Sequence, residues 1–248
     1  MARTKDPHAA AVKSWLTRTR AQNPARGTVV QSGADFAKRG APSIHGMTVD
    51  SPEVKAEADR LHRAAVEMEP EITKLVTSIA KATGGKAEGL AFRLKAPAAI
   101  AGKIMRDVVE KNVSPAEAAS QLSDINRYTI TYDPKTLVAQ GKAAIAALKE
   151  AGWSPYDHKL KNFFVPGDAY DGFNGVYENK DGARFELQFH TPESIKIKEV
   201  AHKIFERWRE TPPSPARDTM WSQMTGLWNN YERPANWDQL PGTRAAQA

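Results

Sequence analysis

Apolar and polar residues alternate most regularly in the second half of the segment 170–194. The apolar members of this alternation are Phe185, Leu187 and Phe189, and the polar members are Arg184, Glu186, Gln188 and His190. A period of two predicts a strand with one buried face and one polar face. Turn residues at 179–182 predict that 173–178 pairs with 183–190 as a hairpin. The polar face is then either a plain solvent-facing surface or a row of functional groups.

A helix is expected directly after this strand. Thr191 is a good N-cap, Pro192 suits the first helical position, and Glu193 lies near the positive end of the helix dipole. Apolar residues at three- and four-residue spacing continue the helix to about residue 209. A carboxylate beside an amide, an imidazole and a helix start indicates a site for a metal and a phosphate.

Other periodic segments complete the expected fold. Helices are predicted at 52–83, 97–111, 115–122, 134–151 and 216–231, and strands at 89–95, 125–132 and 158–165. Interspersed helices and strands indicate an α+β domain with a mixed sheet of about five strands flanked by helices. We expect an N-terminal helix and irregular arm at 1–50, the main domain at 51–211, and a C-terminal helix and tail at 212–248. The tail is expected to be frayed after Pro234.

Composition narrows the class of protein. The 248 residues are 41% hydrophobic, enough for a sizeable core, and they include no cysteine, which excludes disulfides and thiolate metal sites. No apolar run reaches the roughly 20 residues that span a bilayer, and the first residues lack a signal-peptide core. We therefore expect a soluble protein, compatible with action in the cytoplasm. The net charge of +6 favours polyanionic partners such as nucleotides or RNA, although a solvated basic surface has the same charge.

Three cations are placed to meet near the start of a helix. Arg93 and Lys95 share one face of the predicted strand 89–95, and Lys103 lies about two turns into the next helix. Arg offers a planar fork and Lys a point charge, a grouping that suits a triphosphate. Isolated surface cations at the ends of elements have the same appearance in a sequence.

Carboxylates and aromatic rings form further candidate groups. Asp124 lies at the mouth of the strand that contains Arg127, where it either caps a turn or joins Glu186 in a two-carboxylate site for Mg²⁺. Tyr170 and Phe173 precede the hairpin, and either ring could stack on a base. Cations for phosphates, carboxylates for a metal and a ring for a base together indicate nucleotidyl or phosphoryl transfer.

These motifs resemble the synthetase domain of the RelA/SpoT family, the alarmone synthetases that move pyrophosphate from ATP to a ribose 3′-hydroxyl. The resemblance covers roughly residues 69–209. The family's Arg-x-Lys with a helical Lys, its strand-start Asp and its Glu-x-Gln-x-x-Thr are matched by Arg93, Lys95, Lys103, Asp124, Glu186, Gln188 and Thr191. Ala99 stands where the family has a serine.

The resemblance implies a nucleotidyltransferase-like synthetase fold and a role for each matched residue. The ATP phosphates would be held by Arg93, Lys95, Lys103 and Arg127. Mg²⁺ would be bound by Asp124 and Glu186, and Glu186, supported by Gln188, would alternatively act as the base on the acceptor hydroxyl. The acceptor would lie against Tyr170, Phe173, Asn174, Tyr177 and His190.

The chain departs from the housekeeping members of the family around the hairpin. Phe173, Gly175 and Tyr177 occupy positions of the pattern Gly-Tyr-x-Ser-x-His, whose tyrosine stacks on guanine, and His190 replaces a common arginine. The resemblance is therefore to divergent, toxin-like members. It implies a growth-inhibiting toxin that acts on a guanosine or adenosine nucleotide or on the 3′ end of tRNA.

Partners and rival functions stay open at this point. The partners implied are ATP, the acceptor, and an antitoxin or immunity protein, with no membrane partner. Delivery from another cell or particle and the oligomeric state are left undecided by the sequence. One rival is a non-catalytic binding or virion-associated protein on a degenerate synthetase fold. The other is plain nucleotidyl transfer, which would release pyrophosphate instead of AMP.

Overall fold

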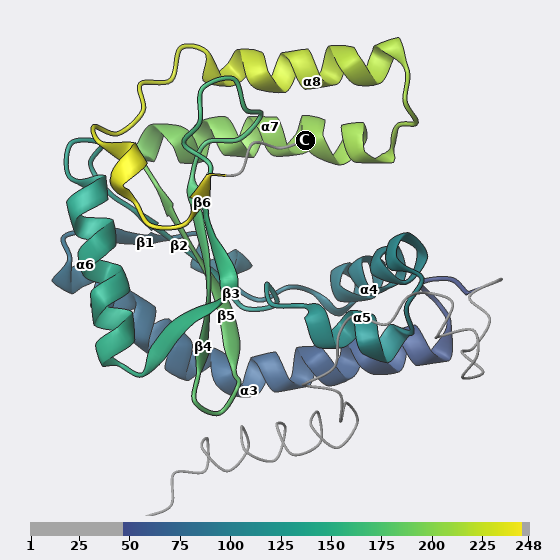
Figure 1. Cartoon of the computed structure of the whole chain (residues 1–248). Coiled ribbons are helices and arrows are strands. Elements are labelled where there is room, and N and C mark those ends of the chain that lie inside the picture. The colour runs from purple at the N-terminus through teal and green to yellow at the C-terminus, as the bar shows by residue number, and fades with distance from the viewer. Residues whose placement is uncertain (1–46, 245–248) are drawn as a thin grey trace, which may run out of the picture. The chain divides into compact units, whose positions relative to one another are not determined.

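The computed structural model describes residues 47–244 (Figure 1). These residues form two compact units. Unit 1 comprises residues 47–73, 91–127 and 180–185, and unit 2 comprises residues 74–90, 128–179 and 186–244. The helix and most of the irregular arm predicted at 1–50 lie outside the described residues. Unit 2 includes both sides of the boundary expected at residue 211, and the division into domains stays a prediction.

The described chain alternates helices and strands. Its α-helices are α3 (Pro52–Ala82), α4 (Pro97–Lys111), α5 (Pro115–Gln121), α6 (Leu137–Glu150), α7 (Pro192–Glu210) and α8 (Pro215–Trp228). Its strands are β1 (Lys86–Glu88), β2 (Arg127–Thr131), β3 (Trp153–Asn162), β4 (Phe173–Asn179), β5 (Arg184–His190) and β6 (Thr243–Arg244). They form one six-stranded sheet in the order β1-β2-β5-β4-β3-β6, in which β1/β2 and β3/β4 are antiparallel and β3/β6 is parallel. The predicted α+β class with a mixed sheet is confirmed.

The start of α7 follows the cap that the sequence predicts. The Thr191 hydroxyl accepts a hydrogen bond from the Ser194 amide over 3.0 Å, and the Ser194 hydroxyl accepts one from the Thr191 amide over 2.9 Å. This reciprocal capping box, with Pro192 at the first position, begins α7. At the start of α5 the Ser114 hydroxyl accepts from the Glu117 amide over 3.2 Å. Local chemistry therefore fixes where the helix after β5 begins.

The apolar face of β5 is buried as predicted, and its polar face is only partly wet. Phe185, Leu187 and Phe189 have no exposed surface. On the other face the first polar residues are half-buried, whereas Gln188 is 4% exposed and His190 is fully buried. In the second half of β5 the polar face is therefore not a plain solvent-facing surface.

The strand predicted at 89–95 is wrong. Gly89 has a φ of +63°, which is outside the strand region, and the chain then forms a short 3₁₀ helix, η1 (Leu90–Phe92). The regular pairing lies earlier, where β1 runs antiparallel to β2. Leu94 keeps one isolated antiparallel bridge to Asn126. The side chains of residues 93–95 therefore alternate as expected, but these residues pair through a single bridge and form no regular strand.

The strand predicted at 158–165 begins and ends earlier than expected, at Trp153 and Asn162. Pro155 lies inside β3 and pairs with Tyr177 of β4. Among the described residues β6 pairs only with positions 161 and 162 of β3, so Pro155 faces no strand on its other side and needs no amide proton there. The register shifts between Pro155 and Leu160, which absorbs the irregularity.

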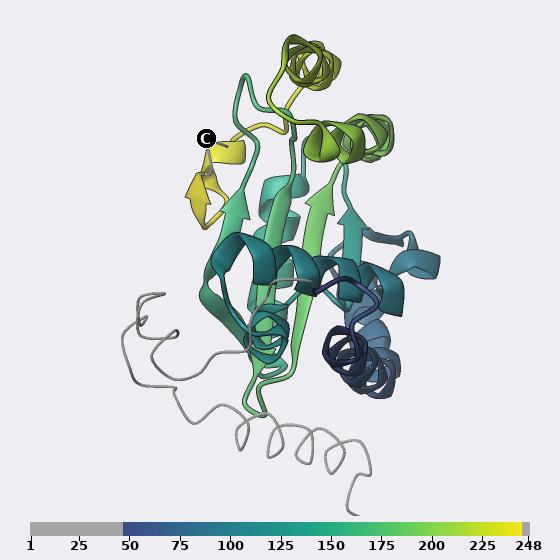
Figure 2. The same cartoon turned by 90° about the vertical axis from the view of Figure 1, so that its right-hand side faces the viewer.

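Residues 235–244 of the tail expected to be frayed after Pro234 pack against the rest of unit 2. They contain a 3₁₀ turn, η2 (Trp237–Gln239), the buried Leu240, and β6 at the edge of the sheet (Figure 2). Gly242 has a φ of +115°, and a Cβ there would lie 2.6 Å from the Leu160 carbonyl oxygen. Glycine thus permits the close approach of the tail to β3.

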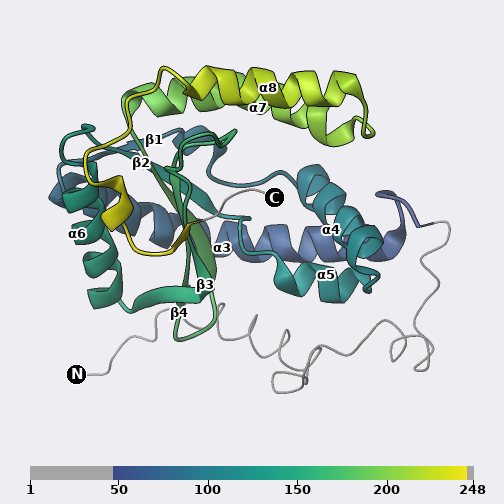
Figure 3. The same cartoon turned by 45° about the horizontal axis from the view of Figure 1, so that its top comes forward.

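Each unit has its own core. The core of unit 1 consists of buried aliphatic residues on α3, α4, α5 and the chain after α5: Val54, Ala58, Leu61, Ala65, Ile100, Ala101, Ile104, Val108, Ala118, Ala119, Leu122 and Ile125. In unit 2, α7 and α8 lie side by side, with the rings of Trp208 and Trp221 5.4 Å apart (Figures 1 and 3). Within residues 47–244, none of the helices has the length and apolar character needed to cross a bilayer.

Candidate functional site

The first candidate cluster lies in unit 1 and centres on Asp124. The Lys95 ammonium is 2.6 Å from one carboxylate oxygen of Asp124, and the Lys103 ammonium is 2.8 Å from the other. Lys95 is brought there by the isolated bridge, because its amide donates to the Ile125 carbonyl over 2.9 Å. Lys103 projects from α4. Two of the three cations that the sequence groups together therefore converge on one carboxylate.

Electrostatics keep this carboxylate ionised. Burial by itself raises the pKa of Asp124, but the ammoniums of Lys95 and Lys103 outweigh it and hold the pKa far below its ordinary value. Burial lowers the pKa of Lys95, against the opposing attraction of Asp124, and the charges of Lys103 and Arg127 lower it further. The cluster is thus a compact, partly desolvated group of charges with two cations to one anion.

Arg93 and Arg127 lie close to this cluster in the chain but have other contacts. Arg93 forms an ion pair with Glu69 of α3, and this bond lowers the pKa of the Glu69 carboxyl. Arg127 donates its amide proton to the Arg93 carbonyl over 2.7 Å, so the two residues flank the same bridge. Glu69 was not predicted as a site residue, because nothing local in α3 indicates that it meets an arginine 24 positions later.

The second candidate cluster lies in unit 2 on β5 and α7. The Gln188 side-chain amide nitrogen donates to Glu186 over 2.5 Å, and its oxygen accepts from the Lys198 ammonium over 2.5 Å. Glu186 and Gln188 are two apart on one strand and share a face, as predicted. Lys198 was not predicted. The only indication of its role in the sequence is that it lies three residues before Ala201, on the same face of α7.

Next to this cluster, Tyr170, Asn174 and His190 form a hydrogen-bonded group. The Tyr170 hydroxyl donates to the Asn174 side-chain oxygen and lies 2.9 Å from the His190 Nε2. The His190 Nδ1 is 2.9 Å from the Ser194 hydroxyl. Burial lowers the pKa of His190 well below its ordinary value, and the charge of Lys198 adds to the effect. The imidazole is therefore neutral near pH 7 and serves as a fixed support for Tyr170.

A cavity of about 210 Å³ opens beside these side chains. It is lined by Phe163, Ala169, Tyr170, Asn174, Gln188, Lys198, Ala201, His202 and Phe205. Aromatic walls, two side-chain amides and one ammonium suit a flat polar ring that carries a negative group. Below we call this space the acceptor cavity, after the role that we propose for it.

Three residues predicted to contact the acceptor are fully buried and not open to a base: Phe173, Tyr177 and His190. Phe173 is fully buried, and its ring stacks on Phe189 with the centroids 5.1 Å apart. Tyr177 is also fully buried, and burial raises its pKa. Both side chains lie on the core face of β4, whereas Asn174 lies on the opposite face and lines the cavity. The stacking role predicted for Phe173 is therefore corrected to a role in the core.

The residues predicted to bind Mg²⁺ fall into the two separate units. Among residues 47–244, acidic and histidine side chains form no group of three that would bind a metal alone. Asp124 is an ionised oxygen donor of the type that Mg²⁺ prefers, but both of its oxygens are bonded to ammoniums. Substrate phosphates would attract these ammoniums, so the residues fit a metal that arrives together with a phosphate. The pairing of Asp124 with Glu186 on one metal stays a prediction.

Comparisons with known proteins were made for the sequence and for the fold. No protein-family model and no curated protein matches the sequence. Among solved structures, the chain is similar to the type VI effector Tas1, solved in complex with its immunity protein, at 18% identity and a TM-score of 0.42, over 71% of this chain and 93% of that one.

Two further similar structures are bacterial proteins. The small alarmone synthetase 2 of Bacillus subtilis is 14% identical, with a TM-score of 0.45 over 68% of this chain and 90% of that one. A GTP pyrophosphokinase family protein of Streptococcus pneumoniae is 14% identical, with a TM-score of 0.47 over 74% of this chain and 91% of that one. At these sequence identities and TM-scores, the similarity is no argument for a particular reaction. The reaction has to be inferred from the side chains. The chain is thus similar to alarmone synthetases, and it resembles them in the order of its motifs.

Proposed function

We propose that this protein is a Mg²⁺-dependent pyrophosphokinase. It would transfer the β,γ-pyrophosphate of ATP to the ribose 3′-hydroxyl of an acceptor, which is a guanosine or adenosine nucleotide or the 3′ end of tRNA. The proposal joins the two clusters in one reaction because their motifs follow each other along the chain in the order of the RelA/SpoT synthetases.

The observation that supports the proposal most is the convergence of Lys95 and Lys103 on Asp124. Two ammoniums held by one carboxylate form a cationic group that is preorganised for a more highly charged anion. A triphosphate would replace the single carboxylate as the partner of the lysines. Arg93 and Arg127 flank the same bridge and would extend the group toward further phosphate oxygens.

The acceptor would occupy the acceptor cavity, with its base against Tyr170 and its polar edge toward Asn174. Glu186 would accept the proton of the 3′-hydroxyl, and Gln188 would hold that carboxylate in place. The 3′-oxygen then forms a bond to the β-phosphorus of ATP, and the bond from that phosphorus to the α,β-bridging oxygen breaks. AMP leaves, and the acceptor keeps the diphosphate on its 3′-oxygen.

Asp124 would hold the metal, and Glu186 would join it as a ligand in the alternative in which it is not the base. When bound, Mg²⁺ would neutralise phosphate charge and so make the β-phosphorus open to attack. The residues of the chain would do the remaining work, which is to bind the phosphates, orient the acceptor and accept one proton.

The cellular consequence that we propose is growth inhibition. A synthetase that consumes ATP without a matching hydrolase would lower the ATP supply of the cell in which it acts, in the cytoplasm of the producing cell or of a cell that receives it. Such a protein needs a restraint, so we propose an antitoxin or immunity protein as its partner.

A non-catalytic binding protein is the second candidate. It is favoured by the saturation of both Asp124 oxygens by lysines, because a purely structural cluster would have the same bonds. The two candidates differ in their response to Mg²⁺-ATP, which a catalytic protein consumes and a degenerate one does not.

The experiment that tests the proposal follows the adenosine part of ATP. The purified chain is incubated with Mg²⁺ and ATP labelled at the α-phosphate, with GDP, GTP, ADP, AMP or bulk tRNA added separately. Pyrophosphate transfer is expected to produce labelled AMP only when the correct acceptor is present. Label that becomes attached to the acceptor would instead indicate nucleotidyl transfer, and unchanged ATP with every acceptor would favour the binding protein.

A further inference from the structure

Tyr170 lies in the loop that connects β3 to β4. This loop, residues 163–172, is closed at its base by a hydrogen bond from the Phe163 amide to the Gly172 carbonyl over 2.8 Å. Two of its residues line the acceptor cavity: Phe163 at its start and Tyr170 near its end. The shape of the cavity therefore depends on how firmly the loop is held.

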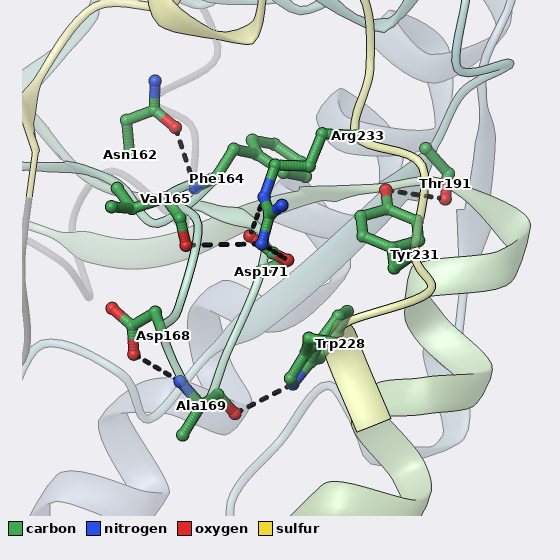
Figure 4. A network of polar contacts seen from close by, with 10 residues as sticks. All are labelled: Asn162, Phe164, Val165, Asp168, Ala169, Asp171, Thr191, Trp228, Tyr231 and Arg233. Atoms are coloured by element: carbon green, nitrogen blue, oxygen red, sulfur yellow. Dashed lines mark hydrogen bonds and ion pairs between the residues drawn. The ribbon is translucent and has the colours of Figure 1, made fainter. Parts of the chain in front are cut away.

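The end of α8 and the chain after it hold the loop at Ala169 and at Asp171 (Figure 4). The Trp228 indole nitrogen donates to the Ala169 carbonyl over 2.9 Å. The Arg233 guanidinium donates to both carboxylate oxygens of Asp171, over 3.0 and 2.8 Å. Ala169 and Asp171 are the two neighbours of Tyr170, so its backbone is fixed from both directions. We call residues 228–244 the C-terminal strap.

The pair of Asp171 and Arg233 is deeply buried. The Asp171 side chain has no exposed surface, and the Arg233 side chain is 17% exposed. Burial raises the pKa of Asp171 to about 6, although the bonds from Arg233 oppose the rise. A buried carboxylate without its guanidinium would be strongly unfavourable, so removal of Arg233 alone should loosen the loop from the strap.

The strap is itself anchored to the rest of unit 2 by two more bonds. The Tyr231 hydroxyl lies 3.1 Å from the Thr191 hydroxyl at the start of α7. The Asn162 side-chain nitrogen, at the end of β3, donates to the Trp237 carbonyl over 2.8 Å. The strap therefore connects the loop to the elements that carry the other walls of the cavity.

The ring of Tyr170 is placed by the strap as well as by the sheet. Trp228 packs edge-on against it, with the ring centroids 6.2 Å apart. From the sheet side, the Tyr170 hydroxyl reaches His190 across Gly172, where a Cβ would lie 2.7 Å from both side chains. A side chain at residue 172 would push the tyrosine away from its partner.

We propose that Trp228 and Arg233 are positioning residues of the acceptor cavity, which act through the loop 163–172 to hold Tyr170 in place. The inference rests on the proposed function for what the cavity binds. It adds that the end of α8 and the region after it contribute to the site. Both residues act on the acceptor cavity through the loop and do not touch the acceptor. Their removal should therefore weaken acceptor binding indirectly and leave ATP binding unchanged.

The test replaces the ion pair in the full chain and measures the loop directly. Arg233→Met removes the charge, Asp171→Asn with Arg233→Met removes both charges, and Arg233→Lys keeps one donor. Arg207→Met, on an exposed position of α7, is the matched control. Amide hydrogen exchange of residues 164–171 is compared with that of β4 and β5, and KM is measured for ATP and for whichever nucleotide accepts label.

We expect at least about tenfold faster exchange in the loop of Arg233→Met, with β4 and β5 unchanged, and partial recovery in Arg233→Lys. KM for the acceptor should rise while KM for ATP stays at the value of the unmodified chain. Unchanged loop exchange in the single and double variants would overturn the inference, as would equal increases in both KM values or failure of both variants to fold. If the unmodified chain transfers label to no acceptor, the proposed function fails, and the exchange data still decide whether the strap holds the loop.

Discussion

The Lys198 ammonium and the Gln188 side-chain oxygen lie 2.5 Å apart, on the far side of the amide from its bond to Glu186. An ammonium can only donate and an ionised carboxylate can only accept, so these two contacts determine which way the amide points. Lys198 thereby fixes the group that holds Glu186 and also supplies the positive charge of the acceptor cavity.

Lys198→Met is therefore expected to lower the rate of transfer. The Gln188 amide would lose the contact that orients it, and the cavity would lose its cation. We expect kcat/KM for the acceptor to fall by about tenfold or more, since a lost charged hydrogen bond corresponds to roughly 1.5 to 3 kcal/mol. Lys203→Met, at an exposed position of the same helix, should leave kcat/KM unchanged. Equal effects of the two substitutions would contradict this role for Lys198.

Asp124→Asn should destabilise unit 1 as well as remove activity. The substitution leaves the Lys95 and Lys103 ammoniums, which are 18% and 32% exposed, without their counter-charge. We expect the free energy of unfolding in urea to fall by roughly 1 to 3 kcal/mol. Asp59→Asn, at an exposed position on α3, should change it very little. A stability loss that disappears on adding ATP would further indicate that phosphates replace the carboxylate.

His190 should contribute a loss of stability in mild acid, opposite in sign to the contribution of Asp171, whose pKa burial raises to about 6. The folded-state pKa of this imidazole lies well below 6.5, so below about pH 6.5 the unfolded chain binds a proton that the folded chain does not. Unfolding is then favoured as the pH decreases, by up to about 1.4 kcal/mol per pH unit for this group. Urea unfolding at pH 7.0, 6.0 and 5.0 measures the slope. His190→Gln should make the slope smaller, and an unchanged slope would show that His190 does not cause it.

Truncation of Phe173 should lower the stability of the fold, whereas truncation of Tyr170 should weaken acceptor binding. Phe173 stacks on Phe189 in the core, so Phe173→Leu should lower the free energy of unfolding by about 1 to 2 kcal/mol and leave the acceptor KM unchanged. Tyr170→Leu removes a cavity wall and should raise the acceptor KM. The pair is compared by urea unfolding and by initial rates. A raised KM in the Phe173 variant would restore its predicted stacking role.

Features governed by neighbouring residues could be predicted from the sequence. The alternation in β5 and the cap at Thr191 obey rules that operate within a few positions, and both are confirmed. The spacing of Lys95 and Lys103 likewise indicated that they converge, although the bridge at Leu94 replaced the expected strand. The prediction of local conformation was wrong at Gly89, where a positive φ interrupts a sequence pattern typical of a strand.

Features governed by distant contacts could not be predicted. Arg233 pairs with Asp171 across 62 positions, and no periodic pattern links the two. Phe173 and Asn174 are neighbours on β4, and only the orientation of the strand determines that the phenylalanine faces the core and the asparagine faces the cavity. Lys198 appears in the sequence as one of many lysines on an amphipathic helix until the fold places it against Gln188.

The proposed reaction requires that Glu186 takes part in moving pyrophosphate from ATP to an acceptor. It is measured most directly with ATP labelled at the γ-phosphate, Mg²⁺ and each candidate acceptor, with the unmodified chain and Glu186→Gln side by side. If the proposal holds, label moves to one acceptor with one AMP released per transfer, and the Glu186→Gln variant, folded to the same extent, transfers at least about a hundredfold more slowly. Full activity in Glu186→Gln, or no label transfer to any acceptor by the folded unmodified chain, would contradict it.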